Sequence, residues 1–278
     1  MKIFVTGARG QLGTELMPLL EPHEVLGVDL PELDITDRAL VLGALHDFGP
    51  DVVINCAAMT AVDACESEVD LAYRVNAMAV RHLAEGCRRL DAHLTTISTD
   101  YVFDGTKDGP YVEWDQPCPV SVYGRSKLAG EIEAGPGATI VRTAWVCGEF
   151  GTNMGKPILR LLGEHDPLTV VDDQRGHPTI VSDLAPVVRQ LSIEKRPGLF
   201  HATNQGAVSW FEFAREVAKA AGADPARVSP CSTEELGASY PAPRPENSVL
   251  DNMALRLSGL PETRDFREPL AELVARLT

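Results

Sequence analysis

The first half of the chain alternates short apolar runs rich in β-branched residues with longer amphipathic stretches. This alternation predicts parallel strands joined by crossover helices, because a parallel strand pair needs a long return connection. We therefore expect a doubly wound, Rossmann-type α/β sheet. The expected strands are residues 3–6, 24–28, 51–56, 93–98 and 139–142, and the expected helices are residues 11–20, 37–46, 68–90 and 122–133.

The second half is less regular, and we expect a smaller C-terminal α/β lobe there. Further strands are expected at residues 168–171 and 198–202, helices at 182–191, 210–221 and 269–277, and a Pro- and Ser-rich loop at 229–245. The predicted Rossmann domain comprises residues 1–148 and about 167–200, and the predicted smaller lobe comprises about 149–166 and 201–278.

Composition excludes several classes of protein. The formal net charge of -15 disfavours attraction to nucleic acid or to an anionic membrane surface. No apolar run approaches the roughly 20 residues of a membrane-spanning helix, and the N-terminus does not resemble a signal peptide. The six cysteines lack C-x-x-C or zinc-ligand spacing. We expect a cytoplasmic protein with reduced thiols.

A glycine-rich turn follows the first expected strand and opens the first expected helix. Its glycines permit a tight turn and close backbone approach, while the helix N-terminus presents N–H groups and a positive dipole to a pyrophosphate. The sequence therefore predicts dinucleotide binding. The turn reads Gly7-Ala8-Arg9-Gly10-Gln11-Leu12-Gly13.

Asp29 ends the second expected strand, where a carboxylate can accept hydrogen bonds from an adenosine ribose. That position favours NADH and repels a 2′-phosphate, but Arg9 is close enough in the turn to reach such a phosphate. Both NADH and NADPH therefore stay open as coenzymes. Asp34 is a candidate for contact with the adenine, while Thr36 and Asp37 have the pattern of helix caps.

Tyr123 and Lys127 stand four residues apart on an expected helix, so both project from one face. A neighbouring ammonium stabilises a phenolate, and we expect it to lower the pKa of Tyr123 from its usual value of about 10. A phenol tuned in this way can deliver a proton near neutral pH. Thr99, at the end of the fourth expected strand, can donate a hydrogen bond to a carbonyl oxygen held beside Tyr123.

With these three elements the chain resembles the extended short-chain dehydrogenases/reductases. Within them it is similar to the dTDP-4-dehydrorhamnose reductase family along essentially its whole length. The glycine turn and the Tyr/Lys pair are shared by the whole superfamily, whereas residues 98–105, 173–179 and 244–248 match segments far more specific to this reductase group. The matching segments include residues 6–13, 53–58, 62–63, 98–105, 123–127, 141–145, 173–179, 209–214 and 244–248.

The resemblance implies a reductase that carries hydride from NADPH or NADH to the C4 keto group of dTDP-4-dehydro-L-rhamnose, giving dTDP-L-rhamnose. Thr99, Tyr123 and Lys127 would be catalytic, with Tyr123 as proton donor. The implied coenzyme-binding residues are Gly7, Arg9, Gly10, Gln11, Leu12, Gly13, Asp29, Asp34, Ala57, Ala58 and Lys127. The implied substrate-binding residues are Thr99, Tyr101, Tyr123, Trp145, Asn153 and Arg244.

Structural roles compete with some of these assignments. Trp145 also fits a core residue, and Arg244 also fits a solvated loop charge. We expect Trp210 and Phe213 to pack the C-terminal helix, and His177 and His201 to be structural. Some relatives bind Mg²⁺ at a dimer contact through a residue placed like Glu15, but its other ligands have no match here. We therefore predict no metal, interpret Glu15 as a solvated carboxylate, and leave a homodimer open.

Three alternative functions stay open at this point. The first is a 4-ketoreductase for another nucleotide-activated deoxysugar, because Met59, Cys147 and Met154 depart from the family pattern near the expected pocket. The second is a sugar-nucleotide dehydratase, which is disfavoured because Tyr101 stands where dehydratases usually carry Glu. The third is a non-catalytic subunit like the regulatory partner of methionine adenosyltransferase. The complete Thr99, Tyr123 and Lys127 set argues against it.

Overall fold

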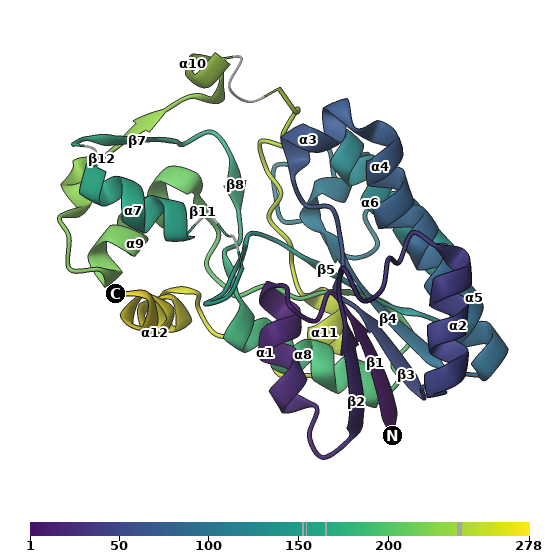
Figure 1. The fold of residues 1–278 in the computed structure, drawn as a ribbon. Coiled ribbons are helices and arrows are strands. Elements are labelled where there is room, and N and C mark those ends of the chain that lie inside the picture. The colour runs from purple at the N-terminus through teal and green to yellow at the C-terminus, as the bar shows by residue number, and fades with distance from the viewer. Residues whose placement is uncertain (152, 154, 165, 238–240) are drawn as a thin grey trace.

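The computed structural model describes residues 1–278 except residues 152, 154, 165 and 238–240, so Met154 lies outside the described residues. The chain forms two lobes (Figure 1). One contains a large twisted sheet covered by helices. The other contains α7, α9, α10 and α12 with short strand pairs beside them. The predicted lobe boundaries stay a prediction.

A six-stranded parallel sheet forms the centre of the larger lobe, in the order β10-β5-β4-β3-β1-β2. The strand order reverses beside β1, which is the doubly wound arrangement predicted from the sequence. The predicted strands are confirmed to within one or two residues at each end. Their bounds are β1 (Lys2–Thr6), β2 (Glu24–Val28), β3 (Val52–Asn55), β4 (His93–Thr99), β5 (Thr139–Thr143) and β10 (Gly198–His201).

Both faces of this sheet are buried because successive side chains of a strand point to opposite sides. On β1, Ile3 and Val5 pack with α1 and α8, whereas Phe4 packs with α2 and α5 on the other face. α6 packs beside α5. The helix bounds are α1 (Gln11–Leu19), α2 (Arg38–Phe48), α5 (Ala79–Leu90), α6 (Val122–Ala134), α8 (Val181–Ile193) and α11 (Met253–Leu257).

The helix expected at 68–90 is interrupted by one π-helical segment, η1 (Arg74–Met78), between α4 (Val69–Tyr73) and α5. A short helix, α3 (Val62–Ser67), precedes it. π-helical turns are uncommon and often occur at functional sites. Here the irregular turn carries Asn76, whose side chain contacts the functional site described below.

The smaller lobe has its own apolar core, built from α7 (Gly155–Glu164), α9 (Trp210–Ala220) and α12 (Arg267–Leu277). The strand predicted at 168–171 is present as β7 (Leu168–Val171). It pairs with β12 (Val228–Cys231) and not with the central sheet. This partner was not predicted, because strand partners depend on long-range pairing that local composition does not encode.

The predicted loop at 229–245 was also partly wrong, since it contains most of β12 and the short helix α10 (Thr233–Leu236). Ser232 and Glu235 cap that helix reciprocally, and this S-x-x-E pattern was a readable signal. The remaining short elements are β6 (Val146–Cys147), β8 (Arg175–Gly176), β9 (Thr179–Ile180), β11 (Val208–Ser209), η2 (Asp100–Val102) and η3 (Pro225–Arg227).

We searched the helices of the described residues for membrane-spanning character. Within that part of the chain, no helix is both long and apolar enough to cross a bilayer.

Candidate active site

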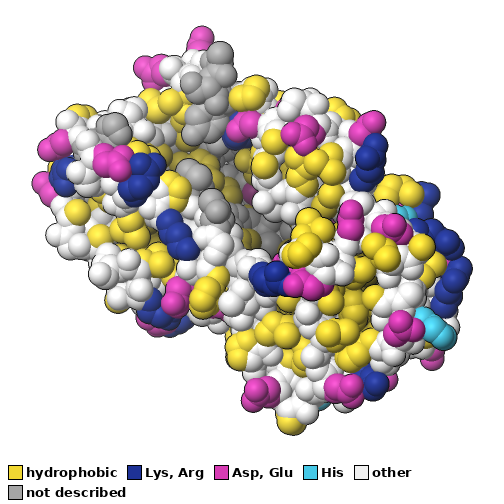
Figure 2. Space-filling model, viewed as in Figure 1, with side chains coloured by type: hydrophobic (Ala, Val, Ile, Leu, Met, Phe, Trp, Pro, Cys, Tyr) yellow, Lys and Arg dark blue, Asp and Glu magenta, His cyan; other side chains and the backbone are white. Residues whose placement is uncertain are grey.

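A cavity of about 750 Å³ lies at the carboxyl ends of β1, β3, β4 and β5 and is closed on its other side by residues of the smaller lobe. The space-filling view shows this hollow between the lobes (Figure 2). Ligands of doubly wound folds bind at this edge of the sheet, and the volume suits a small organic molecule. Of the predicted site residues, the cavity is lined by Gly10, Gln11, Leu12, Ala58, Thr99, Tyr101, Tyr123, Lys127, Trp145, Asn153 and Arg244.

The glycine turn connects β1 to α1 at one end of this cavity. Gly7 has φ 68°, and a Cβ there would lie 2.6 Å from the backbone nitrogen of Ala57. A Cβ on Gly13 would collide with the carbonyl oxygen of Gly7. Gly10 caps α1 without any side chain over its first turn. The turn is therefore a backbone cradle that fits a pyrophosphate.

Asp29 lies where the prediction put it, beside the glycine turn. Its carboxylate accepts hydrogen bonds from the backbone N–H of Arg9 at 3.1 Å and of Leu30 at 2.9 Å. The Arg9 guanidinium forms an ion pair with Glu32 and donates to the Leu30 carbonyl. Arg9 and Asp29, the two residues on which the prediction of the coenzyme rests, thus lie side by side, and Glu32 is an additional acidic neighbour that sequence reasoning missed.

Asp34 lies outside the cavity lining and is exposed. Its Oδ1 accepts hydrogen bonds from the N–H and hydroxyl of Thr36, and these bonds hold its pKa below the usual value. Asp37 caps α2 by accepting from Ala39 and Leu40, which confirms the cap predicted for it. The structure therefore gives Asp34 a local turn role, and its contact with adenine stays a prediction.

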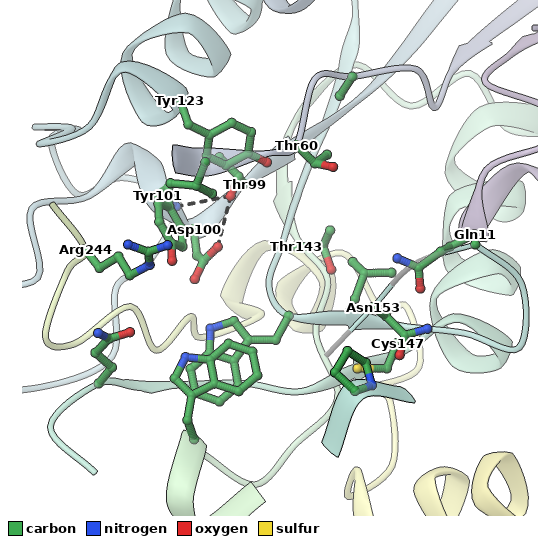
Figure 3. A pocket seen from close by; sticks show the side chains of 18 of the residues that line it. Gln11, Thr60, Thr99, Asp100, Tyr101, Tyr123, Thr143, Cys147, Asn153 and Arg244 are labelled. Carbon is green, nitrogen blue, oxygen red and sulfur yellow. Dashed lines mark hydrogen bonds between the residues drawn. The ribbon is translucent and has the colours of Figure 1, made fainter. Parts of the chain in front are cut away.

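Thr99 from β4 and Tyr123 and Lys127 from α6 all line the cavity, and Figure 3 shows Thr99 beside Tyr123. Ser121 caps α6 by accepting from the Gly124 N–H, which fixes the start of the helix two residues before Tyr123. Lys127 Nζ donates to the Ile97 carbonyl at 2.7 Å. Thr99 Oγ1 donates to Asp100 and accepts from the Tyr101 N–H.

Burial dominates the acidities of these groups. It raises the pKa of Tyr123, although a hydrogen bond with Thr99 acts the other way. The prediction that Lys127 lowers the pKa of this phenol is therefore wrong for the polypeptide by itself. Burial disfavours the charged phenolate more strongly than the neighbouring groups favour it. Burial also lowers the pKa of Lys127 to about 8, and it raises that of Asp100 to about 6.

Asn76, which sequence reasoning missed, joins two segments of the chain beside the cavity through hydrogen bonds. Its Nδ2 donates to Ser126 Oγ at 3.0 Å and to the Met59 carbonyl, while its Oδ1 accepts from the Met59 N–H. Ser126 lies between Tyr123 and Lys127 on α6. The π-helical turn thus connects the segment after β3 to α6, the helix that carries Tyr123 and Lys127. The sequence did offer one signal for Asn76, namely a polar residue on the buried side of the helix expected at 68–90.

Two stacked tryptophans form an apolar wall on the side of the smaller lobe. The rings of Trp145 and Trp210 are 3.6 Å apart and nearly parallel, and both line the cavity. Trp145 has φ 44°, a conformation that non-glycine residues adopt at a cost and that often occurs at functional sites. Trp210 contacts Phe213, and both belong to the apolar core that includes α12, as predicted, but the place of Trp210 in the cavity wall was not foreseen.

Arg244 lies on the cavity wall and is paired with Asp63 on α3. The guanidinium is mostly buried, so the interpretation as a solvated loop charge is wrong. Arg244 also interacts with Tyr101 and limits the burial-driven rise of its pKa. Tyr101 in turn contacts Tyr123 edge to face, with ring centroids 5.6 Å apart.

Gln11 and Asn153 both contact the segment after β6. Gln11 Oε1 accepts from the Gly148 N–H at 3.0 Å, and Asn153 Nδ2 donates to the Gly148 carbonyl at 2.8 Å. The two residues thus connect the glycine turn to the smaller lobe at the far side of the cavity (Figure 3). Their contacts with coenzyme and sugar stay predictions.

The remaining candidates lie away from the reactive groups. Glu15 is half-buried, and burial raises its pKa, so the description of it as a solvated carboxylate is wrong. In the described ranges, no three His, Cys, Asp or Glu side chains gather in a way that could hold a metal ion. His177 and His201 are buried among polar partners. Cys147 is buried in the core of the smaller lobe, yet it reaches the cavity.

The fold and the site together define a Rossmann-type reductase with a phenol and an ammonium beside the dinucleotide turn. The family model described as RmlD substrate binding domain matches residues 1–278, and the chain belongs to that family. The resemblance drawn from the sequence motifs is therefore confirmed.

Individual relatives are similar along nearly the whole chain. A dTDP-4-dehydrorhamnose reductase of Streptomyces griseus is 44% identical and covers 96% of this chain and 91% of its own length. A probable dTDP-4,6-dihydroxy-2-methyloxan-3-one 4-ketoreductase of Streptomyces antibioticus is 41% identical, covering 98% and 94%. The crystal structure of the Bacillus anthracis dTDP-4-dehydrorhamnose reductase in complex with NADP is 38% identical. It superposes with a TM-score of 0.94 over 99% of each chain.

Proposed function

We infer that this protein is an NAD(P)H-dependent reductase of the C4 keto group of dTDP-4-dehydro-L-rhamnose, and that its product is dTDP-L-rhamnose. The observation that carries this inference is that Thr99, Tyr123 and Lys127 line the same cavity as the glycine turn. The family membership and the names of the relatives support the same reaction.

The coenzyme fits the residues present. The glycine turn would hold the pyrophosphate, Asp29 the adenosine ribose, and Lys127 the nicotinamide ribose. A Cβ at Gly7 or Gly13 would collide with neighbouring backbone, so only glycine allows the tight turn that presents backbone N–H groups to a pyrophosphate. When bound, the reduced nicotinamide supplies the hydride.

The side chains of this protein would stabilise the developing charge on the sugar O4 and supply its proton. The Thr99 hydroxyl, which donates to Asp100 in the structure, would rotate its proton to the C4 carbonyl oxygen and polarise it. As C4 is reduced, negative charge develops on that oxygen, and Tyr123 gives it the phenolic proton. The Lys127 ammonium then stabilises the phenolate. Because burial raises the pKa of Tyr123, the donor is protonated at neutral pH before each turnover.

The smaller lobe would bind the sugar nucleotide. We propose that Arg244 pairs with the diphosphate, that Trp145 packs against the deoxysugar, and that Tyr101 and Asn153 complete the contacts. The dTDP-sugar and the coenzyme are metabolites of the cytoplasm, so we place the enzyme there. A homodimer, which the family resemblance suggests, is the assembly to look for by sedimentation.

The experiment that tests this function supplies purified protein with dTDP-4-dehydro-L-rhamnose and either NADH or NADPH. Coenzyme oxidation is followed by the loss of dihydronicotinamide absorbance, and the product sugar is identified by NMR. We expect turnover and dTDP-L-rhamnose. Coenzyme binding without turnover would instead support the non-catalytic reading, although the cavity keeps all three reactive residues.

A second candidate is a 4-ketoreductase for another dTDP-linked deoxysugar, which the name of the Streptomyces antibioticus relative supports. Met59 and Cys147 depart from the family pattern, and both lie at or beside the cavity. Offering a second dTDP-4-keto sugar in the same assay and comparing kcat/KM for the two substrates separates the candidates.

A further inference from the structure

Lys127 has a buried acidic neighbour one turn further along α6, Glu131. Residues four apart on a helix lie on the same face, with Cβ atoms about 5–6 Å apart. Both side chains are anchored to consecutive residues of β4. Lys127 Nζ donates to the Ile97 carbonyl at 2.7 Å, and Ser98 Oγ donates to Glu131 Oε1 at 2.5 Å. The strand thus fixes the two side chains side by side.

Arg142, on β5, holds Glu131 from the other side. Its Nε and Nη2 donate to the two carboxylate oxygens at 2.8 and 2.7 Å, and both side chains are more than 90% buried. The guanidinium also lies 5.1 Å from the ring centre of Phe103. A bidentate, buried ion pair of this kind keeps the carboxylate ionised and in one orientation.

Glu131 and Arg142 do not belong to the cavity lining, whereas Ile97, Ser98 and Lys127 do. Glu131 is therefore set back from the cavity, and it acts on the site through the neighbours that do line it, Lys127 and Ser98. We propose that Glu131 is a positioning residue, a fixed negative charge beneath the cavity that keeps the Lys127 ammonium protonated and held at the Ile97 carbonyl. This inference rests on the proposed reductase function.

The other ionisable groups near Lys127 do not supply a negative charge in place of the Glu131 carboxylate. Cys56, the residue after β3, is partly buried, and burial raises the pKa of its thiol to about 12, so the thiol is neutral. Tyr123, on α6, is protonated for the same reason, and Asp100 interacts with Tyr123. Burial lowers the pKa of Lys127 to about 8, and Glu131 acts against that fall. Without Glu131, burial would act on the ammonium with less opposition.

The test is the pH profile of kcat/KM for the whole enzyme between pH 6 and 10, with Glu131→Gln as the variant. The amide preserves the shape and can still accept from Ser98, but it removes the charge. We expect the alkaline limb, where Lys127 loses its proton, to move to lower pH by about one unit. A limb that stays in place while coenzyme binding is intact would overturn the proposal.

Arg142→Met is the matched control, because it breaks the same ion pair and removes the opposite charge. We expect its alkaline limb to move to higher pH. A purely structural ion pair predicts instead that both variants lose activity without opposite shifts. The double variant Glu131→Gln/Arg142→Met leaves no unpaired buried charge, so it keeps the test valid if a single variant misfolds. Its alkaline limb is also expected at lower pH than that of the wild type.

The outcomes separate this proposal from the proposed function. No turnover by the wild type on either dTDP-4-keto sugar would contradict the reductase function. Turnover without an alkaline limb, or with the same limb in wild type and double variant, would contradict only the role of Glu131. Coenzyme binding measured by fluorescence shows that each variant is folded.

Discussion

Asp63 and Arg244 form an ion pair at the cavity wall, with Arg244 Nη2 2.7 Å from Asp63 Oδ2, although 181 residues separate them in the chain. Asp63 also accepts a hydrogen bond from the Ala242 N–H. Burial of Asp63 raises its pKa, but the hydrogen bonds and charge of Arg244 outweigh burial and hold it below the usual value. The guanidinium is thereby oriented before any ligand arrives.

Arg244→Met should raise the KM for the dTDP-sugar about tenfold or more with a smaller change in kcat, because a charge-assisted hydrogen bond is worth roughly 1.5–3 kcal/mol. Asp63→Asn, which loosens Arg244 without removing it, should give an intermediate rise. Steady-state kinetics at saturating coenzyme measure both. An unchanged KM in Arg244→Met would remove this residue from the substrate site.

Tyr123→Phe should lower kcat by about 100-fold or more, since a positioned proton donor contributes roughly that much, and should leave coenzyme affinity unchanged. Lys127→Ala should weaken both turnover and coenzyme binding. Kinetics and fluorescence titration with NADPH measure the two effects. Normal turnover by Tyr123→Phe would refute its role as proton donor.

Asp29→Ala should move the ratio of kcat/KM values towards NADPH by about tenfold, which corresponds to roughly 1.4 kcal/mol. The carboxylate that repels a 2′-phosphate is lost, and Arg9 stays beside the site. Glu32→Gln should act in the same direction by releasing Arg9. If neither substitution moves the ratio, the adenosine ribose does not bind at this end of β2.

Gly13→Ala should abolish measurable coenzyme binding and destabilise the fold by about 1–3 kcal/mol, because the added Cβ collides with the Gly7 carbonyl and approaches Ala8 Cα at 2.7 Å. Gly43→Ala on α2 is the control. Its Cβ would meet no described atom within 4 Å, and alanine is favoured over glycine in a helix by about 1 kcal/mol. Urea unfolding should therefore give opposite signs for the two variants.

The burial of His177 predicts that the folded state is less stable in acid. Burial lowers its pKa to about 4. The unfolded state therefore binds more protons than the folded state between pH 6.5 and 4, and stability falls as pH falls through that window. From pH 7 to pH 5 the loss from this residue is about 2 kcal/mol. Urea unfolding at both pH values should show a smaller loss for His177→Gln, and an equal loss would contradict the assignment.

Local pattern was sufficient for the central sheet and for the residues at its carboxyl edge. Strand composition, the glycine turn and the Tyr123/Lys127 spacing each depend on neighbours a few residues apart, and the structure places Thr99, Tyr123 and Lys127 in one cavity. The predicted helix at 122–133 was confirmed for the same reason, because its period and its Ser121 cap are local.

The features that were missed depend on contacts between distant segments. The pairing of β7 with β12, the stacking of Trp145 on Trp210 and the ion pair of Arg244 with Asp63 all join residues more than 50 positions apart. The pKa of Tyr123 was predicted in the wrong direction because spacing reveals a neighbouring charge but not the extent of burial.

The last strand of the central sheet, β10, comes from residues 198–201, after the chain has already passed through α7 and β7 in the other lobe. No single cut in the chain can therefore separate the two lobes. A fragment ending near residue 150 would leave β5 as an unpaired edge strand, which is prone to pair with other chains. Attempts to exchange the smaller lobe between relatives need at least two crossover points, and the newly made polypeptide cannot complete its first lobe before much of the second has emerged.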